Sequence, residues 1–460
     1  MQDVMKTMTP VKMAEICGGV YYGNEEPGNK EITGIVRDNR EIANGNMFVA
    51  IKGARVDGNQ FVPAAYEAGA LCCMSEEPPT DAAKPYIQVD NYLEALQKLA
   101  IYYRQLFQGK VIGVTGSVGK TTTKEMLASV LSTRYNTLKT DGNYNNELGV
   151  PLTLFRLNEK HEIAIVEMGI SDFGEMSRLT AIANPDMCVI SNIGQCHLEQ
   201  LGDRDGVLKA KTEIFEGLRQ GGKAYLNGDD DKLITVSDVH GQPPVFFGTD
   251  SINAVHPIRI QGDGLKGTNL TVSTAQGEIE IYVPVPGRHM VTNALAAVAI
   301  GLDLGLSGEE IARGIADFSP VEGHGNVFTT EKFIVMNDCY NANPMSMRAG
   351  LDVLLEAKER KVAIIGDMFE LGDEEEQMHR EIGIYAAGKS LDVIVCIGTL
   401  AKEYIQGIQQ ENSSRECVYF ATLEEALEGL PSVLKEGDAI LVKASHGMHF
   451  EKIVAQLKEM

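Results

Sequence analysis

Short apolar runs alternate with longer helix-like stretches through most of this sequence. Between residues 109 and 318 the runs are KVIGVTG, EIAIVEMG, MCVISNIG and KAYLNGD, and helical patterns lie between most of them. Strands that are apolar at successive positions are typical of a parallel sheet that is buried on both faces. The pattern therefore predicts a mainly parallel sheet with helices on both sides.

The segments on either side of this region also have an α/β pattern. Residues 1–107 mix strand-like runs such as MFVAI with turn signals and end in the helical stretch YLEALQKLAIYYRQLF. After a linker-like PVEGHGNVF at 320–328, residues 332–460 repeat strand and helix with FIVMNDCY, KVAIIGDM, DVIVCIG and AILVKAS. Because 460 residues exceed what one core usually organises, we expect three α/β domains, at 1–107, 108–319 and 320–460.

Composition excludes several classes of protein. The formal net charge of −23 repels the phosphates of nucleic acids, so we expect no DNA or RNA partner. The eight cysteines include no CxxC pair, which favours free thiols in a reducing cytoplasm. MQDVMKTMTP lacks the apolar core of a signal peptide, and VTNALAAVAIGLDLGL is too short to span a membrane. We expect a monomeric cytoplasmic protein without membrane insertion.

The stretch GVTGSVGKTTTKEML at 113–127 predicts a phosphate-binding loop between a strand and a helix. Backbone N–H groups of residues 117–120 would face phosphate oxygens, Lys120 would reach the β and γ phosphates, and Thr121 Oγ would bind Mg²⁺. The spacing departs from GxxxxGK[ST], because Gly113 stands one residue early. The nucleotide contacts predicted here are Thr115, Gly116, Ser117, Gly119, Lys120, Thr121 and Thr122.

Three chemistries compete for such a loop, and a glycine-rich turn with an exposed lysine is the alternative to all of them. The chain has no NKxD segment for reading guanine, which argues against a GTPase. LSGEE at 306–310 only partly matches the signature of a transporter ATPase and more simply caps a helix through Ser307. Kinases and ATP-driven ligases remain.

Polar residues at other strand ends add candidate metal ligands. Glu167 ends EIAIVEMG, where a carboxylate of a parallel sheet lies beside the phosphate loop, although a solvated turn glutamate is the alternative. His197 in SNIGQCHLEQLG is a candidate metal ligand or phosphate donor, with a structural histidine as the alternative. In the helical stretch LKAKTEIFEGL, Lys209 and Lys211 lie on different faces, so at most one of them faces the site.

Together these motifs resemble the Mur ligase family of peptidoglycan synthesis. The resemblance covers nearly the whole chain, and it is carried by the phosphate loop and by TDGNYNNELGVPLTL, VEMG, SNIGQCHLEQLG, KAKTEIF, PGRHMVTNALAAVA, NDCYNANPMSM, GDMFELG, LVKASHGMHFE and RDNREIANGNMFVAIKGARVDGNQF. It implies an N-terminal domain for a UDP-sugar peptide, a central ATPase domain and a C-terminal Rossmann-like domain. It also implies that ATP phosphorylates the carboxylate of a UDP-N-acetylmuramoyl-tripeptide, and that an amine attacks the acyl phosphate. NYNN and CYNANPMSM favour D-alanyl-D-alanine as the amine.

The resemblance also implies roles for single residues at the reacting groups. Lys120, His197 and Lys211 would be catalytic. Thr121 and Glu167 would hold one Mg²⁺, and His197 would help at a second. Lys211 matches a lysine that is carbamylated in several members, which would make it an oxygen ligand of the kind Mg²⁺ prefers; unmodified lysine is the alternative.

The remaining matches concern nucleotide and substrate. Asn146 would lie near the phosphates, Asn293 would contact adenine and Asp338 would meet the ribose. Asn341 and Asn343 would shape the dipeptide side, with turn formation before Pro344 as the alternative. In the first domain the uridine-diphosphate segment would consist of Asp38, Asn39 and Arg40. Because Asp338 and Lys120 fall in different domains, the third domain must close onto the second.

The sequence departs from the family at several positions. His324 and His446 stand where arginines are usual, Ala444 replaces a glycine, and Asn59 stands where histidine is common. Histidine is neither always charged nor bidentate, so a weaker or pH-dependent enzyme, or one that uses other cations, is an open alternative. The candidate cations are Arg288, Arg348 and Lys443. A sibling ligase that adds another amine and a nucleotide-binding relative without turnover also stay open.

Overall fold

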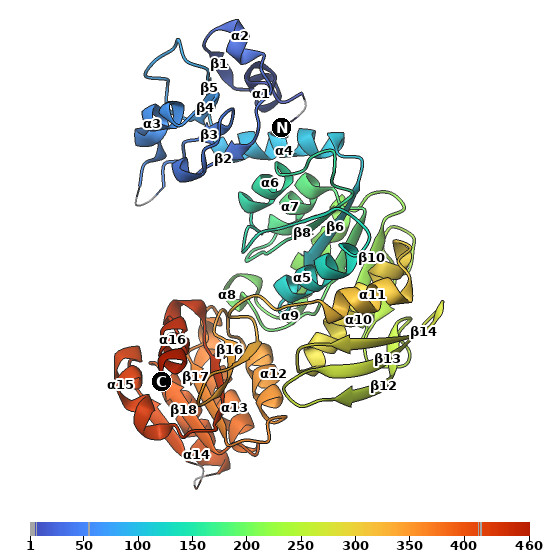
Figure 1. The fold of residues 1–460 in the computed structure, drawn as a ribbon, viewed down its shortest axis with the longest axis vertical. Coiled ribbons are helices and arrows are strands. Elements are labelled where there is room, and N and C mark those ends of the chain that lie inside the picture. The colour runs from blue at the N-terminus through green and yellow to red at the C-terminus, as the bar shows by residue number, and fades with distance from the viewer. Residues whose placement is uncertain (1–4, 6, 54–55, 413, 415) are drawn as a thin grey trace.

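A computed structural model gives the structure of residues 5, 7–53, 56–412, 414 and 416–460. Three α/β bodies follow one another along the long axis of the molecule, in chain order from the N-terminal body to the C-terminal one (Figure 1). The α/β class predicted from the apolar runs is confirmed. Among the described residues, no helix has the length and apolar content needed to span a membrane.

The first body contains a five-stranded sheet in the order β1-β5-β4-β3-β2, with β1 antiparallel to β5 and the other pairs parallel. Its strands are β1 (Val20–Tyr22), β2 (Ile35–Val36), β3 (Met47–Val49), β4 (Cys72–Ser75) and β5 (Tyr86–Gln88). Its helices are α1 (Pro10–Cys17), α2 (Glu25–Gly28), α3 (Val62–Glu67) and α4 (Tyr92–Leu106). Helix α4 begins at Asn91, whose side chain accepts hydrogen bonds from the amides of Leu93 and Glu94.

Helix α4 also joins the first body to the second. The guanidinium of Arg104 is buried, donates to the carbonyl of Ala183 at 2.8 Å, and forms an ion pair with Asp186 at 3.1 Å. A buried charge must be paired, so these contacts fix the helix on the central body.

The second body is built on a six-stranded sheet that is parallel throughout, in the order β11-β10-β9-β6-β8-β7. Its strands are β6 (Lys110–Thr115), β7 (Thr137–Lys139), β8 (Ile163–Glu167), β9 (Met187–Ile190), β10 (Lys223–Asn227) and β11 (Val245–Phe247). The helices are α5 (Lys120–Leu131), α6 (Gly149–Leu154), α7 (Glu175–Ala183), α8 (Leu198–Leu201), α9 (Arg204–Thr212), α10 (Arg288–Asp303) and α11 (Gly308–Ala316). Within β6, Val111 faces one apolar core whereas Ile112 and Val114 face another, so the sheet is buried on both faces as predicted.

A second, three-stranded antiparallel sheet in this body was not predicted. It consists of β12 (His256–Gly262), β13 (Thr268–Thr274) and β14 (Gly277–Val283), which lie beside α10 and α11 (Figure 1). Burial alternates along β14, where Ile279, Ile281 and Val283 face the core. The sequence showed continuous apolar runs only for strands buried on both sides, and this sheet is buried on one side. The predicted cap at Ser307 is confirmed, because its hydroxyl accepts from the amide of Glu310 at 3.2 Å.

The third body has the strand order β15-β16-β20-β17-β18-β19, and only β15 is antiparallel. Its strands are β15 (Asn326–Thr329), β16 (Ile334–Asp338), β17 (Lys361–Gly366), β18 (Val393–Ile397), β19 (Cys417–Phe420) and β20 (Ala439–Lys443). Its helices are α12 (Pro344–Leu354), α13 (Glu375–Ala387), α14 (Ala401–Glu411), α15 (Leu423–Val433) and α16 (Glu451–Glu459). The linker predicted at 320–328 is therefore wrong for residues 326–328, which belong to an edge strand that is too exposed to show a clear apolar run.

Candidate active site

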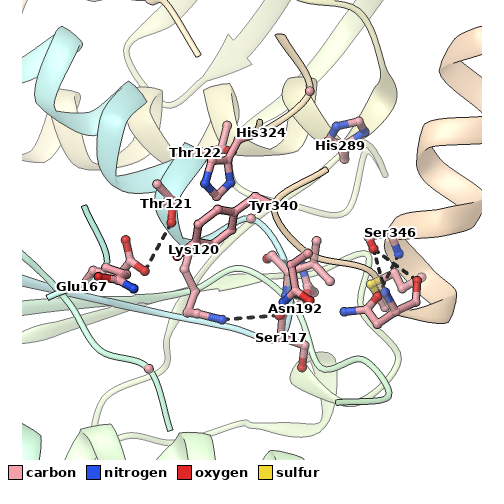
Figure 2. A pocket seen from close by; sticks show the side chains of 18 of the residues that line it. Ser117, Lys120, Thr121, Thr122, Glu167, Asn192, His289, His324, Tyr340 and Ser346 are labelled. Atoms are coloured by element: carbon pink, nitrogen blue, oxygen red, sulfur yellow. Dashed lines mark hydrogen bonds between the residues drawn. The ribbon is translucent and has the colours of Figure 1, made fainter. Parts of the chain in front are cut away.

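A cavity of about 570 Å³ lies between the second and third bodies. The loop between β6 and α5 forms one wall, together with residues that follow β8 and β9. Residues after β16 and in the first turn of α12 form the opposite wall (Figure 2). Because the carboxyl ends of parallel strands share one edge of a sheet, polar groups from distant parts of the sequence meet here.

Two glycines determine the shape of the loop after β6. Gly116 has φ +151°, and a Cβ there would lie 2.0 Å from Ser191 Oγ. Gly119 has φ +81° and forms the N-cap of α5. Side chains rarely adopt these conformations, so the loop requires glycine at both positions. Lys120 folds back on the same loop, and its Nζ donates to the carbonyl of Gly116 at 2.8 Å.

Two backbone amides of the loop donate hydrogen bonds within the protein. The amide of Ser117 donates to the carbonyl of Asn192 at 3.0 Å, and the amide of Val118 donates to Asn192 Oδ1 at 2.9 Å. Both amides are therefore paired with Asn192 in this structure, and their contact with a phosphate stays a prediction. The helix start at Gly119 and Lys120 still provides the amides of the first turn of α5.

Three predicted nucleotide contacts, Thr115, Gly116 and Asn293, lie outside the residues that line the cavity. Thr115 is buried, and its hydroxyl donates to the carbonyl of Met168 at 2.8 Å, which ties β6 to the residue after β8. Asn293 lies on α10 behind Gly119, and its Oδ1 accepts from Thr123 Oγ1 at 3.2 Å. The amide nitrogen of Asn293 is buried and has no hydrogen-bond partner in the described part of the chain.

Glu167 and Thr121 form the centre of a candidate metal site. Glu167 is 1% exposed, and its Oε1 accepts from Thr121 Oγ1 at 3.3 Å (Figure 2) and from Asn145 Nδ2 at 2.8 Å. Its Oε2 is buried and, among the described residues, receives no hydrogen bond. A buried carboxylate with one oxygen that accepts no hydrogen bond, close to the hydroxyl of Thr121, suits a hard cation such as Mg²⁺. The described residues contain no cluster of three or more acidic, histidine or cysteine side chains that could hold a metal ion.

His197 lies at the start of α8 with φ +52°, and its Nδ1 is 3.0 Å from Glu370 Oε2. Burial lowers the pKa of His197, and the positive charges of Lys211 and Lys120 lower it further, whereas Glu370 opposes the shift. Since Glu370 follows β17, this contact joins the second body to the third. The sequence analysis did not select Glu370, which stands in the GDMFELG stretch.

Lys211 is 1% exposed, and burial lowers its pKa to about 8. Its neighbour Lys209 is exposed, with its ammonium 5.4 Å from the ring centroid of Phe173, so the two lysines face different directions as predicted. The helix that carries them is shorter than predicted. Helix α9 ends at Thr212, and a 3₁₀ turn at Glu213–Gly217 follows.

The asparagines of NYNN and CYNANP line the cavity, yet several of their oxygens serve local structure. Asn146 Oδ1 accepts from the amide of Gly149 at 2.9 Å and so starts α6. Asn343 Oδ1 accepts from the amide of Ser346 at 2.9 Å and caps α12, while Asn341 Oδ1 accepts from the next amide at 2.8 Å. Turn formation, the alternative given for Asn341 and Asn343, is therefore present.

Asp338 ends β16 and lines the cavity opposite the phosphate loop. Its Oδ2 lies 2.6 Å from the Nζ of Lys443, which is 1% exposed and also donates to the carbonyl of Asn341 at 2.9 Å. Asp338 and Lys120, which belong to different bodies, therefore line one cavity.

The predicted uridine-diphosphate segment is not part of this cavity. Asp38 precedes a 3₁₀ turn at Asn39–Glu41 in the first body. The guanidinium of Arg40 donates to the carboxylate of Asp38, with Nη2 2.5 Å from Oδ2, and this hydrogen bond lowers the pKa of Asp38 to about 2. Arg40 is thus paired with Asp38.

Comparisons with known proteins agree over almost the whole chain. Family models described as Mur ligase middle domain, Mur ligase, glutamate ligase domain, and Mur ligase family, catalytic domain match residues 114–301, 325–446 and 31–104. UDP-N-acetylmuramoyl-tripeptide–D-alanyl-D-alanine ligase of Bacillus subtilis is 35% identical over 458 residues, which cover 98% of each chain. The chain belongs to the Mur ligase family. The ligase of the same name from Escherichia coli is 32% identical and covers 99% of both chains.

Solved Mur ligases share the fold. A crystal structure of MurF from Acinetobacter baumannii has a TM-score of 0.89 and 34% identity, covering 98% of this chain and 99% of that one. MurF from Thermotoga maritima in complex with ADP has a TM-score of 0.81 and 28% identity, covering 92% and 97%. These matches confirm the three-domain Mur ligase fold that the motifs implied.

His324 and His446, the two positions where the family resemblance leads us to expect arginine, both lie beside the ring of Tyr340. The ring centroids of His324 and Tyr340 are 4.3 Å apart (Figure 2), and those of Tyr340 and His446 are 5.3 Å apart. Burial lowers the pKa of His324, which favours a neutral ring. His324 and Tyr340 line the cavity, and the ring planes in the two contacts are tilted by 33° and 38°.

Only one of the three candidate replacement cations of this Mur ligase lines the cavity. Lys443 does, although Asp338 already pairs with it. Arg288 lines a separate hollow with the acidic residues 229–231, and Arg348 lies 4.6 Å from the ring centroid of Tyr385. Asn59, in the first body, accepts a hydrogen bond from Ser75 at 2.5 Å.

Proposed function

We propose that this chain is an ATP-dependent amide ligase that joins D-alanyl-D-alanine to UDP-N-acetylmuramoyl-tripeptide. The observation that carries the proposal is the placement of Lys120, Thr121, Glu167 and Asp338 around one cavity. Ligases with this substrate name match the chain from end to end, and one related MurF was solved with ADP.

The reaction needs two displacements. A carboxylate oxygen of the tripeptide attacks the γ phosphorus of ATP, the bond to the β,γ-bridging oxygen breaks, and ADP leaves. The free amine of the dipeptide then attacks the acyl carbon, loses a proton, and expels inorganic phosphate from a tetrahedral intermediate. The first step brings two anions together, the carboxylate and the γ phosphate, so positive charge near them and correct positioning supply much of the catalysis.

In this scheme the phosphate loop exchanges its own contacts for those of the triphosphate. Lys120 leaves the carbonyl of Gly116 and moves to the β and γ phosphates, and the first-turn amides of α5 donate to phosphate oxygens. Thr121 and Glu167 would hold a magnesium ion, which supplies neutralisation of phosphate charge when bound. Asp338, on the third body, would accept hydrogen bonds from the ribose.

Lys211 is proposed as the site of a carbamate. A neutral amine attacks carbon dioxide, a C–N bond forms, and a proton is released, which converts a cation into a carboxylate-like anion. Burial supports this proposal, because it lowers the pKa of Lys211 to about 8 and so leaves a fraction of the amine neutral near pH 7. The cations Lys120 and, when protonated, His197 would favour the anionic product.

The other assignments follow from the same reaction. Asn146 is proposed near the phosphates and Asn293 near the base. Asn341 and Asn343 would face the dipeptide, and the first body would hold the uridine diphosphate through residues 38–40. A monomeric state and the absence of a nucleic-acid partner also stay predictions.

Release of ADP by the purified protein should require both the UDP-linked tripeptide and D-alanyl-D-alanine. The physical reason is that the acyl phosphate turns over only when the amine consumes it. A coupled assay for ADP, with mass spectrometry of the peptide product, measures this dependence. A panel of other amines in place of the dipeptide is the control for a sibling ligase.

Two results would contradict the proposed ligation. Equal ADP release without any amine would show that ligation is not the coupled reaction. Nucleotide binding without turnover in the complete mixture would favour a non-catalytic relative, for which the contacts of His324 and His446 with Tyr340 are the supporting observation.

Binding of substrates should contract the molecule. The nucleotide must touch both Lys120 and Asp338, so the third body has to close on the second beyond the His197–Glu370 contact. Small-angle scattering with an ATP analogue and both substrates should show the radius of gyration falling toward the roughly 23 Å expected of a compact chain of this length. An unchanged radius under saturating ligands would contradict closure.

A further inference from the structure

Lys124 is a fully buried lysine that neither the sequence motifs nor the reaction accounts for. It lies one turn after Lys120 on α5, and its exposed fraction is 0%. Its Nζ lies 3.3 Å from Glu167 Oε2 and 3.3 Å from Glu125 Oε1. A buried ammonium is costly unless it is paired, and the carboxylates of Glu125 and Glu167 provide this pairing.

The pairs around Lys124 form a row of alternating charges. Lys139 on β7 forms an ion pair with Glu125, whose other carboxylate oxygen faces Lys124. Lys124 in turn faces Glu167, whose far oxygen meets Thr121 and Asn145. The four formal charges, two positive and two negative, cancel. The row is therefore balanced without any metal ion.

At Glu167, where the row ends, the carboxylate and Lys124 form an ion pair without a hydrogen bond. Lys124 lies at ion-pair distance from Oε2, yet among the described residues that oxygen receives no hydrogen bond. Lys124 therefore neutralises the carboxylate without occupying the oxygen by a directed bond. A divalent cation that reaches Glu167 and Thr121 alone would add two uncompensated positive charges beside a buried ammonium.

We propose that Lys124 is the resident counter-cation of Glu167 and makes metal binding at Thr121 and Glu167 conditional on the triphosphate. The negative phosphates bring the charge that offsets the incoming metal ion. The metal then enters with the nucleotide and does not occupy the site by itself. Lys124 is a positioning residue in this account, and the inference rests on the proposed metal site of the ligase.

The test compares the nucleotide-free full-length protein with two lysine variants. Lys124→Met removes the buried charge, and Lys139→Met removes the outer charge of the same row, where the side chain is 41% exposed. Binding of Mn²⁺ is followed by electron paramagnetic resonance, and the melting temperature is followed against added Mg²⁺. Neither readout requires turnover.

Removal of Lys124 should create metal binding without nucleotide. We expect Lys124→Met to bind Mn²⁺ about tenfold or more tightly than the parent protein does, because a repelling charge near the ion is gone. Its melting temperature should be lowered in metal-free buffer and should rise with Mg²⁺. Lys139→Met should stay within about twofold of the parent, since its charge is solvated and more distant. If Lys124→Met and Lys139→Met bind Mn²⁺ equally tightly, the inference is overturned.

A second variant covers the case in which Lys124→Met does not fold. Glu125→Gln leaves Glu167 as the one carboxylate partner of Lys124, so Mn²⁺ together with a non-hydrolysable ATP analogue should bind several-fold more weakly. Unchanged binding overturns the inference. Failure of the parent protein to bind Mn²⁺ with the ATP analogue would instead count against the proposed function.

Discussion

Replacing Lys120 with alanine is expected to lower kcat for ADP formation by about a thousandfold or more. In the proposed mechanism the ammonium group is the positive charge of the loop that reaches the transferred phosphoryl group, and charge stabilisation of this kind is among the largest contributions to phosphoryl transfer. The neutral variant keeps the glycines that shape the loop, so the fold should survive. Initial rates with the UDP-linked tripeptide, D-alanyl-D-alanine and ATP measure the effect.

Lys209→Ala is the matched control for this variant. Lys209 is exposed, and its ammonium lies near the ring of Phe173, outside the residues that line the cavity. Its removal should leave kcat within about twofold of the parent. If peptide product accumulates at the parental rate in the Lys120 variant, Lys120 does not carry the phosphate charge and the proposed mechanism fails.

Exchange of Lys211 for arginine should lower kcat by about a hundredfold or more. Arginine stays positive and does not form the carbamate, so the anionic oxygen ligand would be replaced by a cation. In the parent protein, ¹³C-labelled bicarbonate should give a carbamate resonance that the variant lacks. Because burial lowers the pKa of Lys211 to about 8, the neutral fraction of its amine, and with it the signal, should rise between pH 7 and pH 9.

The direction of this pH dependence tests whether the carbamate forms on the amine of Lys211. Protonation removes the nucleophilic lone pair, so a signal that rises as pH falls would contradict carbamate formation on this amine. Addition of acetate to a Lys211→Ala variant is a further control, since a free carboxylate small enough to enter can replace the missing anion. A parent protein that shows full activity and no carbamate signal would show that unmodified lysine serves at this position.

The local part of the site could be predicted from the sequence because it depends on short-range geometry. A glycine-rich turn between a buried strand and a helix places Lys120 and Thr121 at a helix start, wherever the rest of the chain goes. A parallel sheet places the end of β8 beside that turn, and the structure indeed has Thr121 Oγ1 3.3 Å from Glu167. The apolar runs were sufficient for the central sheet, since burial on both faces leaves a continuous signal.

Other partners were missed because their roles depend on packing between distant segments. Asn192 follows β9, and only the pairing of β9 with β6 brings it under the amides of Ser117 and Val118. Lys124 looks in sequence like a helix-surface lysine, and it is buried because α5 packs against β8, which ends at Glu167. The antiparallel strands β12, β13 and β14 escaped prediction because one face of their sheet is exposed.

The sequence by itself determined the α/β class, the phosphate loop and the family, because each of these is written in contiguous residues or in fixed spacing. Only the tertiary structure decided that Lys120 and Asp338 line one cavity, that the ring of Tyr340 contacts both His324 and His446, and that Lys124 lies at ion-pair distance from Glu167. Those relations join groups far apart in the chain. Coulombic and stacking interactions act over a few ångströms, so they exist only where the folded backbone brings their partners together.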